Sequence, residues 1–600
     1  EEAARAPLEP VRREETQIKA PHFVLYVVDV LAERYGRRAV YGGGLRVITS
    51  LDLDLQTECE KIVREHVTAW APEHKARNAA AVVIRPSTGE VLAMVEPRQP
   101  GSSFKPYTYA AAFEQGYAPA SLFYDVRTAF PDPPFVPYVP ENFDRLFHGP
   151  MPLRTALACS YNVPAVSLMY RIGLDSALEM AHRLGITTLR DRERYGLALT
   201  LGGGEVSLLD HTYAFGVFAN GGVMAGVPVP PERREPGFRE LDPVCVLQAT
   251  DGLGRVIEEF KGPTLKEVLS PQVAYLITNI LSDNAARAPA FGTNSPLVLS
   301  RPAAAKTGTT NDYCDGWTMG YNPQIAVGVW MGNADRTPMR AMWGGRGAAP
   351  IWHDIMEYAL KDLPVADFVE PPGVKWVTVD ADSGLLPGPY TRSTVKELFI
   401  EGWEPARKDD MHQAFAICQA SGQLATPYCP LDQVEEQIFR VYPSEVQDWL
   451  RSTNQPQAPT SYCGQHGPNQ RAADPTITIP GNYQAVGGVI EVTGNARTPG
   501  FREYQLEYGA GLQPGEWIPI GGPHHNPVDN QVLEYWDVTQ LGGLYTLRLT
   551  VRGDEERRVS VPVTVDNEPP RIRIIHPNDG DLYVKEDDEY LNLQVEVSDN

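Results

Sequence analysis

The chain has 600 residues, which is too long for a single hydrophobic core, and its 42% hydrophobic and 22% charged residues are typical of folded domains rather than disordered chains. Its formal net charge of -23, without a clustered cationic face, argues against a nucleic-acid-binding protein. No run of residues approaches the roughly 18 to 20 apolar residues that span a bilayer.

Residues 1–75 predict a connector without chemistry of its own. The segment 24–31 is apolar and helix-like, the alternation over 45–49 predicts a strand, and Asp52 or Asp54 is placed to cap a following helix. The chain starts without a methionine and stops in strand-like sequence. We therefore expect a fragment, with any membrane anchor upstream.

Residues 76–365 have the pattern of an α+β domain built on an antiparallel sheet. Strands at 81–84 and 91–95 predict a hairpin, helices with apolar faces dominate 105–225, and three further strands follow between 305 and 332. This is the part of the chain in which we expect the active site.

The remaining sequence predicts all-β modules after a connector. Residues 366–470 are proline-rich and contain three cysteines, whereas 471–567 show the period-2 strands of an Ig- or fibronectin-like β-sandwich. The string Pro475-Thr-Ile-Thr-Ile recurs as Pro570-Arg-Ile-Arg-Ile. We therefore expect residues 568–600 to begin a second, truncated sandwich.

Four residues of the connector suggest either a disulfide or a metal site. Cys418, Cys429, Cys463 and His466 could form a Cys₃His zinc site, but the spacing between the first two cysteines is wide for one. A disulfide between Cys418 and Cys429 is the favoured interpretation, and the sequence leaves the zinc alternative open. We expect no cofactor, and no metal in the active site.

The candidate chemistry lies in three short motifs: Ser102-Ser-Phe-Lys105, Ser160-Tyr-Asn162 and Lys306-Thr-Gly308. Each motif alone is weak, because 393–396 repeats the first pattern and 282–284 repeats the second. The copy at 393–396 lies in a β-rich segment, where three-residue spacing does not co-orient side chains. The copy at 282–284 ends an apolar helix and is interpreted as a turn.

Ser102 is the best-placed nucleophile. Pro106 cannot lie deep inside a helix, so the helix that contains it must begin near Ser102 or Ser103. Lys105 then shares a face with Ser102. A serine hydroxyl is a weak nucleophile, so Lys105 must be neutral to take its proton, and a second cation at Lys306 would lower the pKa of Lys105.

Longer strings around these motifs resemble the class A penicillin-binding proteins, which are bifunctional peptidoglycan synthases. The strings are Gln99-Pro-Gly-Ser-Ser-Phe-Lys-Pro106, Gly202-Gly-Gly-Glu-Val206, Lys306-Thr-Gly-Thr-Thr-Asn-Asp312 and Gly328-Val-Trp-Met-Gly332. The resemblance covers roughly residues 20–365. The family's upstream glycosyltransferase domain is not in this sequence, and the join from Val95 to Pro100 is shorter than is usual in the family.

The resemblance implies a role for each motif residue. Ser160 would relay protons, Asn162 would bind the substrate amide, and Thr307 and Thr309 would bind its carboxylate. The backbone N–H groups of Ser102 and Thr309 would form the oxyanion hole. We further expect Gly308 to let the substrate backbone approach closely.

The implied reaction is D,D-transpeptidation of D-Ala-D-Ala stem peptides through a serine acyl-enzyme that β-lactams trap covalently. A D,D-carboxypeptidase or a β-lactamase would carry the same motifs, and a wall-binding or sensor protein with an inactive site is the alternative outside enzymes. The resemblance implies peptidoglycan stem peptides as substrates and other wall-synthesis proteins as candidate partners. It also implies a membrane-anchored parent protein, with this chain on the extracytoplasmic face.

Overall fold

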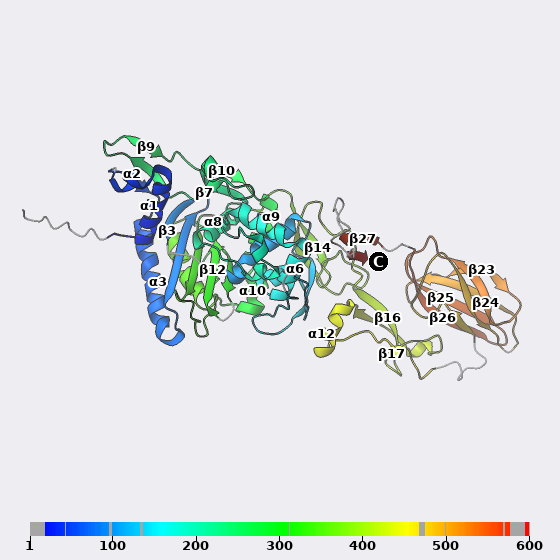
Figure 1. The fold of residues 1–600 in the computed structure, drawn as a ribbon. Helices are drawn as coiled ribbons and strands as arrows, with labels where there is room; N and C mark the ends of the chain where they lie inside the picture. The colour runs from blue at the N-terminus through cyan, green and yellow to red at the C-terminus, as the bar shows by residue number, and fades with distance from the viewer. Residues whose placement is uncertain are drawn as a thin grey trace, which may run out of the picture. The chain divides into compact units, whose positions relative to one another are not determined.

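The computed structural model describes residues 18–42, 44–94, 99–132, 136–310, 313–466, 475–498 and 500–567, and the backbone of 571–576 and 594–598 (Figure 1). These residues form two compact units. Unit 1 runs to Asp410 and includes Tyr442–Asn454, whereas unit 2 comprises Met411–Val441 and the chain from Gln455 onwards. The segment 366–470 is therefore divided between the two units instead of forming one connector.

Unit 1 is built on a five-stranded sheet in the order β11-β12-β13-β2-β3, in which every neighbouring pair is antiparallel. Its strands are β2 (Asn78–Arg85), β3 (Glu90–Met94), β11 (Ala304–Thr309), β12 (Asp315–Tyr321) and β13 (Ala326–Gly332). The predicted α+β fold is confirmed. The predicted strand end at residue 95 and the part of the short join that runs to residue 98 lie outside the described residues.

Both faces of this sheet are buried, which explains its nearly continuous apolar strands. Along β2, Val82 and Ile84 belong to one core cluster, and Val83 between them belongs to a second cluster on the opposite face. Helices α3 (Leu53–His74) and α11 (Ala348–Leu360) pack on the second face. Helices α4 (Lys105–Glu114), α8 (Leu208–Ala219) and α9 (Pro271–Ser282) contribute to the first.

The N-terminal segment is part of unit 1. Helix α1 (Pro21–Tyr35) buries Phe23, Val27 and Leu31 in the first core cluster, and β1 (Arg46–Thr49) pairs antiparallel with β8 (Val246–Thr250). The Asp52 carboxylate accepts hydrogen bonds from the first turn of α3, as the sequence predicted. The expected boundary at residue 75 is therefore not a boundary between compact units.

The other elements of unit 1 complete the helical layer and its smaller sheets. The helices are α2 (Arg37–Gly42), α5 (Leu153–Ala158), α6 (Asn162–Ile172), α7 (Leu174–Leu184) and α10 (Asn284–Phe291). The strands are β4 (Leu122–Asp125), β5 (Gly149–Pro152), β6 (Val223–Pro228), β7 (Leu241–Asp242), β9 (Val256–Glu259) and β10 (Thr264–Glu267).

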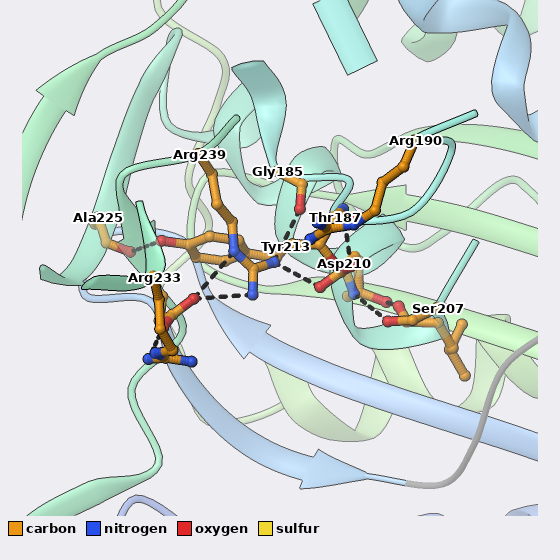
Figure 2. A network of polar contacts seen from close by, with 12 residues as sticks. Gly185, Thr187, Arg190, Ser207, Asp210, Tyr213, Ala225, Arg233 and Arg239 are labelled. Atoms are coloured by element: carbon orange, nitrogen blue, oxygen red, sulfur yellow. Dashed lines mark hydrogen bonds and ion pairs between the residues drawn. The ribbon is translucent and has the colours of Figure 1, made fainter. Parts of the chain in front are cut away.

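A buried ionic network fixes the N-terminal end of α8 (Figure 2). Arg239 donates to Asp210 at 2.5 Å, to the Gly185 carbonyl at 2.8 Å and to Asp242 at 3.0 Å. The other Asp210 oxygen accepts from the backbone and side chain of Thr187. These bonds join α7, α8 and β7, so the position of α8 is fixed independently of its apolar face.

Two segments that follow the sheet in the sequence pack on the core of unit 1. The hairpin of β14 (Val374–Asp380) and β15 (Thr394–Ile400) is held by Glu397, whose carboxylate accepts two hydrogen bonds from Arg154. Helix α12 (Gln447–Ser452) places Trp449 against Gly149, and the indole N–H donates to the Phe147 carbonyl at 2.9 Å. The chain thus returns to unit 1 at Tyr442.

Unit 2 contains a small sheet and a two-sheet sandwich. The small sheet has the order β17-β16-β18, formed by β16 (His412–Cys418), β17 (Gln423–Leu424) and β18 (Val434–Arg440). The sandwich sheets are β19-β21-β24 and β20-β26-β25-β22-β23, and one apolar cluster lies between them. In β25 the alternate residues Leu547, Leu549 and Val551 are buried, as the period-2 pattern predicted.

The sandwich strands are β19 (Thr476–Ile479), β20 (Gln484–Val486), β21 (Val489–Ala496), β22 (Glu503–Ala510), β23 (Ile518–His524), β24 (Val528–Asp537), β25 (Gly543–Arg552) and β26 (Glu556–Val565). The strand that contains the repeated string pairs in the same way in both copies. Strand β19 pairs antiparallel with β21, and β27 (Arg571–His576) pairs antiparallel with β28 (Gln594–Ser598). This pairing supports the expected start of a second module.

The favoured disulfide between Cys418 and Cys429 is not formed, and both cysteines are free. The disulfide was favoured because the spacing of these two cysteines is wide for a zinc site. The fold instead brings them together with Cys463 and His466, which sequence separation could not show.

Within the described ranges, no helix combines the length and the apolar character needed to span a membrane.

Candidate active site

Ser102 lies in a 3₁₀ turn, Gly101–Phe104, that leads directly into α4. The backbone N–H of Lys105 donates to the Ser102 carbonyl, and in such a turn the side chains of residues i and i+3 eclipse one another. Pro106 occupies the first turn of α4, where its missing N–H has no helical partner to lose. The turn therefore places the Lys105 side chain on the same side as the Ser102 hydroxyl.

Backbone segments pack against this turn so closely that they require glycine. A Cβ on Gly202 would lie 2.2 Å from the Gly101 nitrogen, and one on Gly308 would lie 2.1 Å from the Pro100 carbonyl oxygen. Gly202 ends the 3₁₀ helix Leu197–Leu201 at φ +86°, a left-handed conformation that favours glycine. The missing side chain of Gly308 makes room for the nucleophile turn, and the expected approach of a substrate backbone at this glycine stays a prediction.

The Lys105 ammonium nitrogen is buried and points at the loop between α5 and α6. It lies 2.6 Å from the Ser160 carbonyl oxygen, 2.9 Å from that of Tyr161 and 2.8 Å from Asn162 Oδ1. Burial and the nearby Lys306 charge lower the pKa of Lys105 well below its usual range, and Asp125 opposes them. This lysine is therefore suited to accept a proton.

Ser160 lies between the two buried lysines. Its hydroxyl oxygen accepts a hydrogen bond from Lys306 Nζ at 2.6 Å and lies 3.5 Å from Lys105 Nζ. Ser160 adopts φ +65°, a left-handed conformation that is uncommon for a residue other than glycine. Such strain is found at functional positions that the surrounding structure holds in place.

Lys306 is the second buried cation of the site. Burial and, to a lesser extent, the Arg287 guanidinium lower its pKa to about 7, and Cys159 opposes them. Its ammonium group also donates to the Thr307 carbonyl at 2.9 Å. A lysine with this pKa changes its charge near neutral pH, so Lys306, Ser160 and Lys105 form a continuous path for protons.

A chain of side chains missed by the sequence analysis orients Asn162. The Asn162 backbone N–H, at the first turn of α6, donates to Asn142 Oδ1 at 2.7 Å, and Asn142 in turn donates to the buried Asp125 carboxylate. Asn162 Nδ2 donates to the Glu141 carbonyl at 2.7 Å. Since that bond uses one of its two N–H groups, the other is left to bind a substrate.

The backbone of Thr309 is placed at the open edge of the sheet beside the nucleophile turn. Strand β11 is an edge strand, and Thr310 donates to Asp315 across the ladder, so the alternating pattern turns the Thr309 N–H away from β12. A Cβ on Gly101 would lie 2.6 Å from that nitrogen. The Thr309 amide thus lies beside Gly101, the residue before Ser102.

A second buried chain of hydrogen bonds holds the nucleophile turn to α8. The Ser103 hydroxyl donates to the Pro100 carbonyl at 2.7 Å and lies 2.8 Å from His211 Nε2. Burial lowers the pKa of His211 to about 3, so the ring is neutral. His211 Nε2 then donates to Ser103, and Nδ1 accepts from the Tyr107 hydroxyl at 2.6 Å.

Comparison with known families identifies this part of the chain. The penicillin binding protein transpeptidase domain matches residues 79–357, and the C-terminal domain of penicillin-binding protein 1A matches residues 370–414. Residues 79–357 are a penicillin-binding protein transpeptidase domain.

Relatives of known sequence extend the similarity beyond the domain. Penicillin-binding protein 2D of Bacillus subtilis is 28% identical over 432 residues, which are 68% of this chain and 59% of that protein. Penicillin-binding protein 1A of Pseudomonas aeruginosa is 31% identical over 338 residues, 50% of this chain and 40% of that protein. The chain spans about half the length of the curated relatives it matches.

Solved structures show the same fold. Penicillin-binding protein 1A from Haemophilus influenzae superimposes with a TM-score of 0.55 at 20% identity, covering 66% of this chain and 77% of that chain. PonA1 from Mycobacterium tuberculosis gives a TM-score of 0.50 at 23% identity, covering 59% of this chain and 96% of that chain. At these identities the likeness concerns the fold.

The structural environments of the predicted motifs differ from those of their copies. Lys396 is exposed on β15, and Ser393 is exposed just before that strand. Ser282 ends α9, where its hydroxyl donates to the Asn279 carbonyl, and Asp283 caps α10. Neither copy lies in a buried polar cluster like that around Ser160.

The transpeptidase domain also carries three aromatic side chains near the motif residues. Phe143 lies 5.7 Å from Tyr313 and 5.9 Å from Trp343, measured between ring centroids. The N–H of Gly344, next to Trp343, donates to Thr309 Oγ1 at 3.0 Å. Phe143 is 58% exposed, so this group offers an apolar surface beside the end of β11. No motif marked these residues in the sequence.

Proposed function

We propose that Ser102 is the acyl-accepting nucleophile of a peptidoglycan D,D-transpeptidase. The observation that carries this proposal is the convergence of Lys105, Ser160 and Lys306 beside the Ser102 turn, within a penicillin-binding protein transpeptidase domain. The substrate is a stem peptide that ends in D-Ala-D-Ala.

In the acylation step, neutral Lys105 takes the proton of the Ser102 hydroxyl as its oxygen attacks the carbonyl carbon of the penultimate D-Ala. The tetrahedral oxyanion is held by the backbone N–H groups of Ser102 and Thr309. The C–N bond to the terminal D-Ala then breaks, and the leaving amine takes a proton that reaches it through Ser160 from the lysine pair. An ester on Ser102 and free D-Ala result.

The remaining motif residues bind the donor peptide. The unassigned N–H of Asn162 Nδ2 donates to a substrate amide carbonyl. Thr307, which is buried, and Thr309, whose Oγ1 accepts from Gly344, would bind the terminal carboxylate together with charged Lys306.

In the second step, an amine from a neighbouring stem peptide attacks the ester carbonyl, forms the new amide bond and releases Ser102. β-Lactams open on the same hydroxyl. The solved PonA1 complex, which holds penicillin V, has the same fold as this domain and supports that part of the proposal. We place the chain in the class A group, on the extracytoplasmic face of the membrane and in contact with other wall-synthesis proteins, because it matches the C-terminal domain of penicillin-binding protein 1A and relatives of that name.

The test uses a soluble peptide ending in D-Ala-D-Ala together with an excess of an acceptor amine. A transpeptidase releases D-Ala and forms the acceptor amide, which mass spectrometry separates from the hydrolysed peptide. Hydrolysis alone, with no acceptor product at any acceptor concentration, would indicate a D,D-carboxypeptidase. Absence of both products, together with stable penicillin binding, would favour a sensor.

A further inference from the structure

Four side chains converge in unit 2, far along the sequence from the transpeptidase domain. Cys418, Cys429, Cys463 and His466 each offer one ligand atom, and these atoms all lie within 4.8 Å of one another. The three cysteines are buried, and His466 is partly buried. Three thiols and an imidazole are the ligand set of a structural Cys₃His zinc site.

The distances agree with tetrahedral coordination. With Zn–S bonds of about 2.3 Å and a Zn–N bond of about 2.0 Å, a tetrahedron separates sulfur and nitrogen by roughly 3.6 Å. His466 Nδ1 lies 3.5 Å from Cys418 Sγ and 3.4 Å from Cys463 Sγ. These two distances match a tetrahedral arrangement, and all four ligand atoms lie within 4.8 Å of one another.

The backbone holds the three ligand segments together. Cys418 ends β16, and its carbonyl accepts from the backbone N–H groups of Ser421 and Gly422 in the following turn. The backbone N–H of Cys463 donates to the Leu424 carbonyl at 2.7 Å, next to the hairpin. Sequence separation made Cys418 and Cys429 look too far apart for one site, but these turns bring both to the third cysteine.

Cys429 also has a hydrogen-bond donor suited to a thiolate. The backbone N–H of Thr426 points at Cys429 Sγ at 3.3 Å, and the Thr426 hydroxyl lies 3.5 Å from the same sulfur. Groups that hydrogen-bond to metal ligands orient them and tune the metal.

The small sheet of unit 2 has few buried apolar side chains. The cluster around the thiols consists of Ala416, Ala425 and the three cysteines, with Val434 and Tyr483 packed against it, and the other buried apolar residues of β16 and β17 are Ala414, Ile417 and Leu424. A core of this size is far below what a segment of this length needs, and natural modules of this kind add a metal or disulfides. One disulfide would use two of the sulfurs and leave the third, with the imidazole, without a role.

We propose that Cys418, Cys429, Cys463 and His466 bind one Zn²⁺ ion tetrahedrally, and that this ion stabilises the small sheet of unit 2. Four protein ligands close the coordination sphere, so the site is structural and not catalytic. The proposal does not depend on the function proposed for Ser102.

The first test measures zinc in the full chain, produced without a metal-binding tag and dialysed, by elemental mass spectrometry. We expect one zinc per chain, and loss of that zinc in Cys463→Ser and in His466→Ala. Cys59→Ala, which removes a buried cysteine of α3 in unit 1, is the matched control and keeps the metal. Wild-type chain without zinc, or variants that retain it, would overturn the proposal.

A second measurement guards against variants that fail to fold. The wild-type chain is reconstituted with Co²⁺, for which a tetrahedral thiolate site gives a thiolate-to-metal charge-transfer band and intense visible bands. Fluorescent penicillin labelling of the same variants reports whether unit 1 is intact. Thiols are counted after denaturation without reductant: all seven cysteines reactive once zinc is removed supports the site. Two missing thiols, with no bound metal, would show the disulfide and contradict it.

Discussion

At the scale of single residues, the site depends on placing two lysines in one buried polar cluster. Lys105 and Lys306 are linked through the Ser160 hydroxyl, and burial lowers the pKa of both lysines. Because Lys105 acts as a base only when neutral, the charge on Lys306 bears directly on the pH at which Ser102 can be acylated.

Lys306→Met should move the pH profile of penicillin acylation. A lysine with a lowered pKa is neutral above that pKa, so the acylation rate rises with pH through it. Removing the Lys306 charge raises the pKa of Lys105, and the rising part of the profile moves to higher pH. Acylation rates with fluorescent penicillin across the pH range measure this, and Lys396→Met serves as the exposed control. An unchanged or lower position of the rise would refute the coupling.

Tyr107→Phe tests the buried chain that reaches the nucleophile turn. Without its hydroxyl, His211 Nδ1 is a buried acceptor with no donor, which costs about 1–3 kcal/mol of stability. The urea midpoint, followed by loss of penicillin binding, should fall accordingly. Tyr109→Phe on the same helix is the control, because among the described residues the Tyr109 hydroxyl has no hydrogen-bond partner. Equal midpoints for the two variants would contradict the role of His211.

Residue-level chemistry was only partly predictable from the sequence. Ser102, Lys105, Ser160 and Lys306 carry short motifs, and local rules such as the position of Pro106 placed them correctly on turns and strands. The residues that position them carry no motif, because Asp125, Asn142 and His211 act through contacts between distant segments. The packing that requires glycine at position 308 was not predicted for the same reason: the carbonyl that a Cβ would meet belongs to Pro100.

At the scale of elements, the active site needs α8 and the nucleophile turn to be held in a fixed position relative to each other. Arg239 pairs with Asp210 at the start of α8, as Figure 2 shows. The next residue of that helix, His211, is hydrogen-bonded to Ser103 in the nucleophile turn. The positions of helices and strands could be predicted from the periodicity of apolar residues and from turn residues. The Arg239 network could not, because its members lie on separate elements.

Arg239→Met should destabilise unit 1 strongly. It leaves the buried carboxylate of Asp210 without its cation, which costs about 3–5 kcal/mol, whereas the partly exposed Asp242 keeps its pair with Arg233. Arg190→Met, which removes a solvent-exposed pair with Glu235, should cost below about 1 kcal/mol. The urea midpoint for loss of penicillin binding compares the two variants. Similar losses in both would show that the Arg239 network has no special weight.

At the scale of the whole molecule, the chain passes between the two units more than once. Residues 442–454 return to unit 1, where Val446 and Leu450 pack with Val126. Composition shifts along the sequence mark where strands replace helices, but they cannot show which compact unit a short segment joins. That choice depends on contacts between residues far apart in the chain, such as Trp449 with Gly149.

A chain that ends at His466 should still be acylated by penicillin at the rate of the full chain. Every residue assigned to the chemistry lies in unit 1, and the shortened chain keeps both segments of that unit and the proposed zinc ligands. Labelling kinetics with fluorescent penicillin compare the two chains. A markedly slower rate would mean that the sandwich contributes to the site.

The most direct test of the account is to locate the penicillin adduct. The full chain, Ser102→Ala and Ser393→Ala are incubated with penicillin, and intact mass and peptide mapping identify the modified residue. We predict one stable adduct on Ser102 in the wild-type chain and in Ser393→Ala, and none in Ser102→Ala. An adduct on any other residue, or one that persists in Ser102→Ala, would contradict the assignment of Ser102 as the nucleophile.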